Sequence, residues 1–204
     1  MATREILKDG ERALTKKSRP VTDFNNRLHI LLDDMRETLI DANGLGLAAP
    51  QVGILRRAVL VVKTDDKPEI NDEENEEDVD DEDNEDDDEY DDEKHRQWYN
   101  EHIVELINPE IINYDGEQTG SEGCLSVPGV YGLVTRPQTV VVRAQNRHGD
   151  SFVLEVGDLT ARAVCHEVDH LDGVIFTSLV EKFLTEEELA ELRAQHEQEG
   201  KKDQ

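Results

Sequence analysis

Apolar residues recur every three or four positions from Phe24 to Ala42, which predicts an amphipathic helix with one face against the core. Gly44 follows this pattern and is expected to end the helix. We interpret the run from Leu159 to Leu171 as a second helix. Residues that can cap these two helices precede or begin them: Thr22 or Asp23 for the first, Asp158 or Thr160 for the second. A capping box, Thr185 to Glu188, opens a last, polar helix.

Short apolar runs between the helices have the character of strands. A continuous run predicts a buried strand, and alternation with β-branched residues predicts a hairpin around a polar turn at residues 147–150. Asn108-Pro109 is read as a turn between two of the strands. The expected strands are Arg57 to Val62, Ile103 to Ile107, Ile111 to Tyr114, Thr139 to Asn146 and Phe152 to Val156.

The charge of the chain is concentrated in one tract. The formal net charge of the 204 residues is −27, but residues 65–93 hold 21 Asp or Glu and one Lys, which leaves −7 for the other 175 residues. Repulsion and the lack of apolar side chains predict disorder there. We therefore expect a single domain, 1–204, with a disordered loop insertion at about 64–98. This acidity disfavours nucleic acid and anionic membrane as partners.

Export and membrane insertion are not expected either. The N-terminus has no apolar signal segment, and no run of 18 apolar residues occurs. The protein is expected to be soluble and to stay where it is made. Its two cysteines, Cys124 and Cys165, are expected to be reduced thiols, which leaves them free to bind metal.

The strongest chemical motif is HEVDH, residues 166–170. On a helix, His166 and His170 lie one turn apart on one face, where two imidazoles can bind one metal ion. Glu167 then lies beside the metal and can take a proton from a water that the metal activates. Two exposed histidines on a helix would give the same pattern by chance. The motif therefore predicts metal-assisted hydrolysis only if other residues support it.

A catalytic site of this kind usually has three protein ligands. Metzincin proteases supply a third histidine downstream, but this chain has Phe176 at that position. Cys124, within Glu122 to Gly129, can be the third ligand or a small core residue. Cys165 points away from the two histidines and is assigned to packing. Asp169 can reach the metal, or orient a ligand or pair with an arginine.

A run of small residues, Gly44 to Gly53, leads to one polar side chain, Gln51. Its glycine spacing does not fit the dinucleotide fingerprint. A tight turn and a functional loop are both consistent with it. The amide of Gln51 can donate a hydrogen bond to a polarised oxygen.

Together, three segments resemble the motifs of the peptide deformylases: GLGLAAPQ at residues 44–51, EGCLS at 122–126 and HEVDH at 166–170. The resemblance covers nearly the whole chain and departs only at residues 64 to about 98. It implies an α+β fold, with antiparallel or mixed sheets packed around a central metal-binding HExxH helix and with an N-terminal and a C-terminal helix. It also implies hydrolysis of the formyl group from N-formylmethionine at the start of new polypeptides, with release of formate.

The resemblance implies a role for each site residue. Cys124, His166 and His170 would bind one divalent ion, with iron(II) expected and zinc, nickel or cobalt able to replace it. Glu167 would be the general acid and base. The Gln51 side chain and the Leu125 backbone N–H would bind the oxyanion. The substrate would meet the following residues: Leu45, Gly46, Glu122, Gly123, Leu159 and Ala163. An ion pair between Arg136 and Asp169 is also implied.

Further expectations follow from the family. The partner would be a formylmethionyl peptide or nascent chain, with the final helix docking on the ribosome, and the protein would be a cytoplasmic monomer. Two competing hypotheses belong to other classes. A zinc endopeptidase shares HExxH but does not require EGCLS. A non-enzymatic protein would use the acidic tract for binding cations or basic partners.

Overall fold

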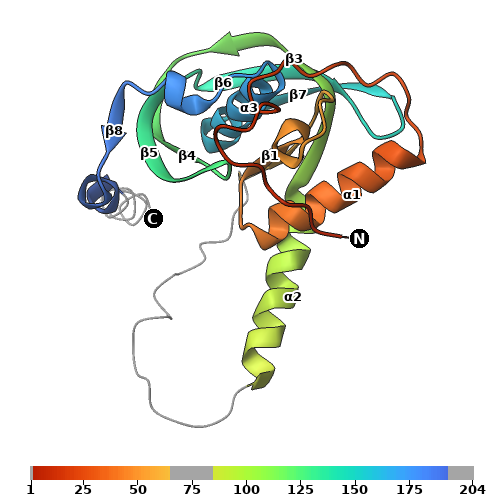
Figure 1. Ribbon diagram of the computed structural model, residues 1–204, viewed down its shortest axis with the longest axis horizontal. Coiled ribbons are helices and arrows are strands. Elements are labelled where there is room, and N and C mark those ends of the chain that lie inside the picture. Colours follow the sequence, from red (N-terminus) through yellow and green to blue (C-terminus); the bar gives the residue numbers. More distant parts are fainter. Residues whose placement is uncertain (1, 65–84, 193–204) are drawn as a thin grey trace.

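The computed structural model describes residues 2–64 and 85–192, and for residues 85–92 it describes the backbone alone. Most of the acidic tract therefore lies outside the described residues. In the described residues, two antiparallel sheets and four helices form an α+β fold, which confirms the expected class (Figure 1). One sheet has the strand order β1-β2-β3-β6-β7, and the other has the order β4-β5-β8.

The elements follow one another along the chain as α1 (Asn26–Asp41), β1 (Gly46–Ala48), a 3₁₀ turn (Ala49–Val52), β2 (Ala58–Val62), α2 (Glu85–His102), β3 (Ile103–Asp115), β4 (Gln118–Cys124), β5 (Val127–Arg136), β6 (Thr139–Gln145), β7 (Ser151–Gly157), α3 (Asp158–Leu171), a second 3₁₀ turn (Phe176–Ser178) and β8 (Lys182–Leu184). Residues 186–192 are again helical.

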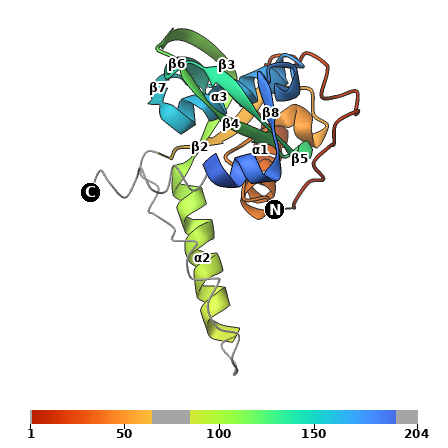
Figure 2. The same cartoon turned by 90° about the vertical axis from the view of Figure 1, so that its left-hand side faces the viewer.

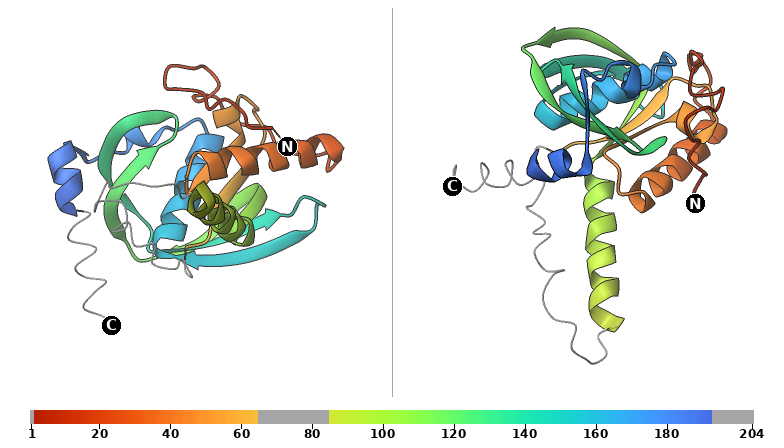
Figure 3. Two further views of the ribbon diagram at one scale, coloured as in Figure 1. Left: turned by 90° about the horizontal axis from the view of Figure 1, so that it is seen from below. Right: turned by 60° about the vertical axis from the view of Figure 1, so that its left-hand side comes forward.

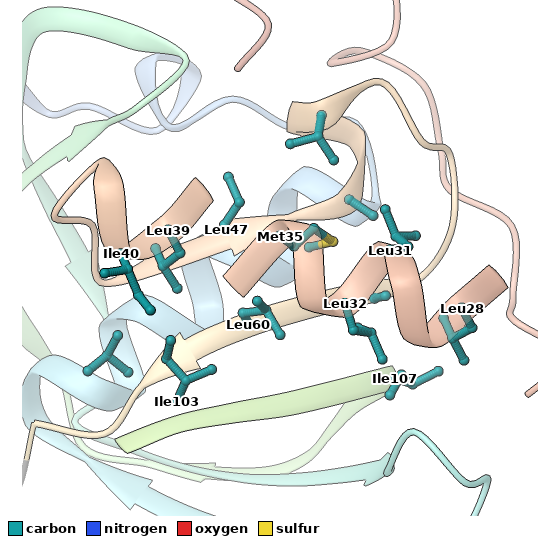
Figure 4. Close-up of a cluster of buried hydrophobic side chains, with 14 of the residues drawn as sticks. Leu28, Leu31, Leu32, Met35, Leu39, Ile40, Leu47, Leu60, Ile103 and Ile107 are labelled. Atoms are coloured by element: carbon teal, nitrogen blue, oxygen red, sulfur yellow. The ribbon is translucent and has the colours of Figure 1, made fainter. Parts of the chain in front are cut away.

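Helix α1 covers one face of β1, β2 and β3 with an apolar stripe (Figure 4). The side chains of Leu32, Met35 and Leu39 have no exposed surface, and each such burial contributes about 1.5–3 kcal/mol. The expected caps were wrong: the side chain of Asn25 accepts hydrogen bonds from the N–H groups of Arg27 and Leu28. The helix starts later than the apolar pattern because Phe24 precedes this cap.

Strand β3 is longer than the sequence suggested. We expected a turn at Asn108-Pro109, but one strand of 13 residues runs through it with a register shift between Ile107 and Glu110. Asn108 has φ 52°, and its side chain bonds Val21 N (2.8 Å), Val21 O (2.9 Å) and Gln145 (2.8 Å). These tertiary bonds hold a β-bulge where the local sequence alone favours a turn.

Helix α3 lies between the two sheets (Figures 1 and 2), and most of its residues from Thr160 to Leu171 are buried, while Asp158 and Leu159 at its start are exposed. Ala161, Val164 and Cys165 pack against β6 and β7 in one apolar cluster, which confirms the packing role expected of Cys165. Neither expected cap is used. Gly157 precedes the helix without a side-chain cap bond, Asp158 accepts from Gln138, and Thr160 bonds Thr64 at 3.1 Å.

The second half of the expected disordered insertion is a helix. Residues 85–98 belong to α2. This helix projects from the rest of the protein and contacts it at its C-terminal end (Figure 1). Trp98 packs on the cluster formed by α1, and Tyr99 is a buried member of it. Two aromatic anchors thus give this end of the helix a core contact that the acidic composition did not reveal.

The capping box at the last helix is present as expected: Thr185 N donates to the Glu188 carboxylate (3.0 Å), and Glu188 N donates to Thr185 Oγ1 (3.2 Å). Within the described parts of the chain, no helix is long and apolar enough to cross a membrane.

Candidate active site

The three expected metal ligands lie together. The ligand atoms of Cys124, His166 and His170 are all within 4.8 Å of one another. The Cys124 Sγ is 3.2 Å from His170 Nε2. One thiolate and two imidazoles at such distances match the donor sets of catalytic zinc and iron sites, in which metal bonds of about 2.0–2.3 Å join each donor to the ion. The donor set fits a divalent cation.

Two elements that are far apart in the sequence supply these ligands. His166 and His170 are one turn apart on α3, with ring centroids 5.0 Å apart. Cys124 ends β4, where the register with β5 shifts after Glu122 and Val127 pairs with Cys124. The shift turns the thiol toward α3. The Sγ also accepts a hydrogen bond from Ser126 N at 3.4 Å.

A buried charge network fixes the first of the two rings. His166 Nδ1 is 3.1 Å from Glu122, so that Nδ1–H donates to the carboxylate and Nε2 is the nitrogen that can bind a metal once it has lost its proton. Burial alone would raise the pKa of Glu122, but hydrogen bonds from His166 and Arg136 lower that pKa to about 2. Glu122 is therefore a permanent anion that orients His166.

The ring of His170, the second of the two, is uncharged and can act as a metal ligand. Burial, with repulsion from His166 and Arg136, lowers the pKa of His170 to about 3. Burial would also lower the pKa of His166, but hydrogen bonds with Cys124 and Glu122 raise it to about 10. A cation at the His166 ring must therefore displace a proton, so that metal binding is expected to release acid.

Arg162 is a site residue that the sequence analysis missed. Its Nη1 donates to Glu122 (2.9 Å) and to the Val134 carbonyl (2.9 Å), and the residue is 6% exposed. Arg136 also donates to Glu122, at 2.9 and 3.1 Å. The sequence places Arg162 four positions before His166 and hence on the same helix face, but this spacing does not indicate its pairing with Glu122.

We expect Glu122→Gln to destabilise the protein. The substitution leaves the buried guanidinium group of Arg162 without its anion and that of Arg136 with Asp169 alone, which should lower the free energy of unfolding by about 3 kcal/mol. Urea denaturation at pH 7 measures this loss. The control is Glu110→Gln, which breaks the exposed pair with Arg143 and should cost under about 1 kcal/mol. Equal losses in the two variants would contradict the network.

Glu167 faces the metal ligands from the next position on α3. Its side chain is 4% exposed, and Oε2 is buried without a hydrogen-bond partner among the described residues. Burial raises the pKa of Glu167 to about 7, while a nearby cation would act in the opposite direction. A Cβ on Gly46 would lie 2.6 Å from Glu167 Cγ, so only glycine allows this approach.

Gln51 reaches the ligands from the 3₁₀ turn. Its Oε1 accepts from Ala48 N at 2.7 Å, which fixes the amide with Nε2 toward the site. Nε2 is 3.6 Å from Cys124 Sγ and 3.3 Å from Ser126 Oγ. The buried hydroxyl of Ser126 is a second group that sequence reasoning did not single out.

A cavity of about 650 Å³ opens in front of these groups. Nearly all the residues singled out in the sequence line this cavity. His170 is not part of the lining and is 1% exposed. The cavity lining includes Leu45, Gly46, Gln51, Glu122, Gly123, Cys124, Leu125, Leu159, Ala163, His166 and Glu167.

Asp169 does not join the ligand cluster. Its carboxylate accepts from Arg136 at 2.6 Å, which confirms the expected ion pair. Arg136 thus joins Glu122 on β4 to Asp169 on α3 and holds the cysteine-bearing strand against the histidine-bearing helix.

Comparisons with known proteins show the family of this chain. Residues 3–185 match the family model described as polypeptide deformylase. A peptide deformylase of Caldicellulosiruptor bescii is 43% identical over 194 residues, which are 95% of both chains. Peptide deformylase 1 of Bacillus subtilis is 43% identical and covers 94% of this chain and 99% of its own.

Solved structures give the same result. A peptide deformylase from Thermotoga maritima has a TM-score of 0.68 at 29% identity, covering 89% of this chain and 99% of that one. A class I type b peptide deformylase from Acinetobacter baumannii, with Met-Ala-Ser bound, has a TM-score of 0.67 at 29% identity, covering 88% and 99%.

Proposed function

Because this chain belongs to the polypeptide deformylase family, we propose that the residues around Cys124 divide the work of deformylation between metal ligands, a proton carrier and oxyanion donors. The enzyme is a metal-dependent hydrolase that removes the formyl group from the N-terminus of new polypeptides. The observation that carries the division of roles is the meeting of Cys124, His166 and His170 within 4.8 Å, beside Glu167 and Gln51.

Cys124, His166 and His170 would hold the metal. A divalent ion bound by these residues would supply a Lewis acid for the formyl oxygen and would lower the pKa of a water toward neutral pH. Iron(II) is the ion we propose, with zinc, nickel or cobalt able to occupy the same ligands. Glu122 sets the ring of His166, since its carboxylate accepts from Nδ1 at 3.1 Å.

Glu167 would move the proton. As a carboxylate it accepts a proton from the attacking water, and it then donates that proton to the leaving amine when the C–N bond breaks. Its buried Oε2, which has no partner in the described part of the chain, supports this role. Burial, which raises the pKa of Glu167, makes it easier for the carboxylate to take up a proton and hold it for the leaving amine.

Gln51 and Leu125 would bind the negative oxygen that forms at the formyl carbon. The Gln51 amide is held by its Oε1 bond to Ala48 N, so Nε2 is oriented before substrate arrives. The backbone N–H of Leu125, which lines the cavity, would be the second donor. Donors fixed in advance lower the barrier because they need no reorganisation during the reaction.

The methionine side chain would enter the cavity between Leu45, Leu159 and Ala163, next to Glu122. The backbone of Gly46 and that of Gly123 would bond an extended peptide. The Acinetobacter baumannii deformylase was solved with Met-Ala-Ser bound, and this tripeptide is the product that a formyl-Met-Ala-Ser substrate would leave here.

We expect Gln51→Glu to lower kcat about 10²-fold, the effect typical of losing one oxyanion donor. Glutamate keeps the oxygen that accepts from Ala48 N but replaces the donating amide, so the fold should be retained. Initial rates of formate release measure the loss, and the melting temperature controls for folding. A wild-type kcat would exclude Gln51 as an oxyanion donor.

The same substrate tests the overall assignment. Formyl-Met-Ala-Ser should yield formate and intact Met-Ala-Ser. A zinc endopeptidase, which the comparisons do not support, would cut the peptide internally and release no formate.

We further propose that the chain is one domain, 1–204, that acts as a cytoplasmic monomer on nascent chains and docks on the ribosome through its last helix.

A further inference from the structure

We propose that α2 fixes one wall of the substrate cavity through Asn43, and that Tyr99 and His95 are positioning residues for substrate binding. The inference rests on the proposed function of the cavity. It concerns α2, whose residues 85–98 belong to the region in which this chain departs from the family pattern.

Asn43 lies at the junction between α1 and β1. It has φ 49°, the left-handed conformation that ends a helix and that asparagine tolerates better than other side chains. Asn43 N donates to Ile40 O at 3.0 Å, and Gly44 N donates to Leu39 O at 3.2 Å. The direction in which the chain leaves α1 toward the cavity therefore depends on this one residue.

The side chain of Asn43 is held by α2. Its Oδ1 accepts from the hydroxyl of Tyr99 at 2.8 Å and lies 3.3 Å from His95 Nε2. Tyr99 is 3% exposed, and its ring stands 4.8 Å from that of His95. The Tyr99 bond is thus partly shielded from water, where a hydrogen bond contributes more than at the surface, while the His95 contact is exposed.

Other contacts hold α2 against α1 independently of Asn43. Arg96 pairs with Glu37 and, at 3.2 Å, with Asp41, while Arg36 donates to the carbonyl of Asn100 at 3.3 Å. These bonds join the C-terminal end of α2 to α1, and this end of α2 lies beside α1 in Figure 1 and in the right view of Figure 3. Removing the Tyr99 hydroxyl alone should therefore leave α2 in place.

Asn43 and its neighbours in the chain form one wall of the cavity. Residues 42–46 all line it. A Cβ on Gly44 would be 2.9 Å from Leu125 Cδ1 and 3.0 Å from Leu39 Cδ1, so this segment packs tightly against the residue proposed to bind the oxyanion. Close-packed atoms transmit small shifts. A displaced Asn43 would move the wall against which the substrate binds.

The test compares KM with kcat in purified, metal-loaded protein with formyl-Met-Ala-Ser as substrate. We expect Tyr99→Phe to raise KM about five-fold, the effect of one lost hydrogen bond, and to change kcat less than about two-fold. Asn43→Gly keeps the left-handed backbone but loses the acceptor, and it should raise KM similarly. The double variant should be no worse than the stronger single one, because both remove the same bond.

Two further variants make the result specific. Asn43→Asp restores an acceptor oxygen and should recover most of the KM lost in Asn43→Gly. Tyr114→Phe removes a hydroxyl from an exposed tyrosine on β3 and should leave KM unchanged. A lower melting temperature with unchanged KM, or KM effects that multiply in the double variant, would overturn the positioning role. A wild-type protein that releases no formate would instead contradict the proposed function.

Discussion

Glu167→Gln should reduce formate release about 10³-fold in kcat while the protein keeps its metal, because a positioned acid–base group typically contributes 10²–10⁴-fold. Glutamine has nearly the same shape, so the variant should fill the space beside Gly46, where Glu167 Cγ leaves no room for a Cβ. It cannot accept a proton from water. The variant therefore separates proton transfer from metal binding.

The measurement is steady-state formate release together with metal analysis and a melting temperature. The control is Glu155→Gln, which removes an exposed carboxylate on β7 and should leave kcat unchanged. If Glu167→Gln kept a near-normal rate on a formyl-Met peptide, another group would have to carry the proton, and the assignment of Glu167 would be wrong.

Cys124→Ala is expected to lower metal affinity more than about 100-fold, and activity with it. Loss of a group that only orients a ligand already costs 10–100-fold in affinity, and Cys124 would be a direct ligand. Its Sγ lies 3.2 Å from His170 Nε2, and alanine leaves two imidazoles where three donors are needed. Activity and metal content should fall in parallel.

Anaerobic purification followed by metal analysis measures this effect, since a thiolate bound to iron(II) is open to oxidation. Cys165→Ala is the matched control. Cys165 is buried in an apolar cluster on the same helix as the histidines, and burial raises the pKa of its thiol to about 11, so it stays a neutral packing group. Wild-type metal content in Cys124→Ala would remove Cys124 from the ligand set.

The fold was predictable where local patterns decide it. The hairpin of β6 and β7 has the expected extent within one or two residues, because alternation of apolar and polar residues matches the pleat of a strand. Helix ends were less predictable. Several small polar residues precede α1, and Asn25 serves as cap because it alone stands where its side chain meets the first free N–H groups.

The site was predictable as a set of residues, but not as a network. Glu122 was expected to border the methionine pocket, and it does line the cavity. The side chain of Glu122, however, is only 3% exposed, and its carboxylate accepts from Arg136, Arg162 and His166. It therefore offers no free acceptor to substrate. No local pattern indicates that a carboxylate in EGCLS will neutralise an arginine on a distant helix.

By itself, the sequence determined the chemistry: two imidazoles one helical turn apart with a carboxylate beside them, a cysteine in EGCLS and an amide after a glycine-rich run. The proximity of the two imidazoles and the carboxylate depends on a spacing of a few residues, which helix geometry converts directly into a shared site. Cys124 and Gln51 carry the right chemistry in their motifs, but only the tertiary structure brings them to the histidines. Only the tertiary structure decided that β3 continues through Asn108, that Arg162 balances Glu122, and that α2 holds Asn43. The partners in the last two contacts are 40 and 56 positions apart, and only packing of the whole chain brings them together.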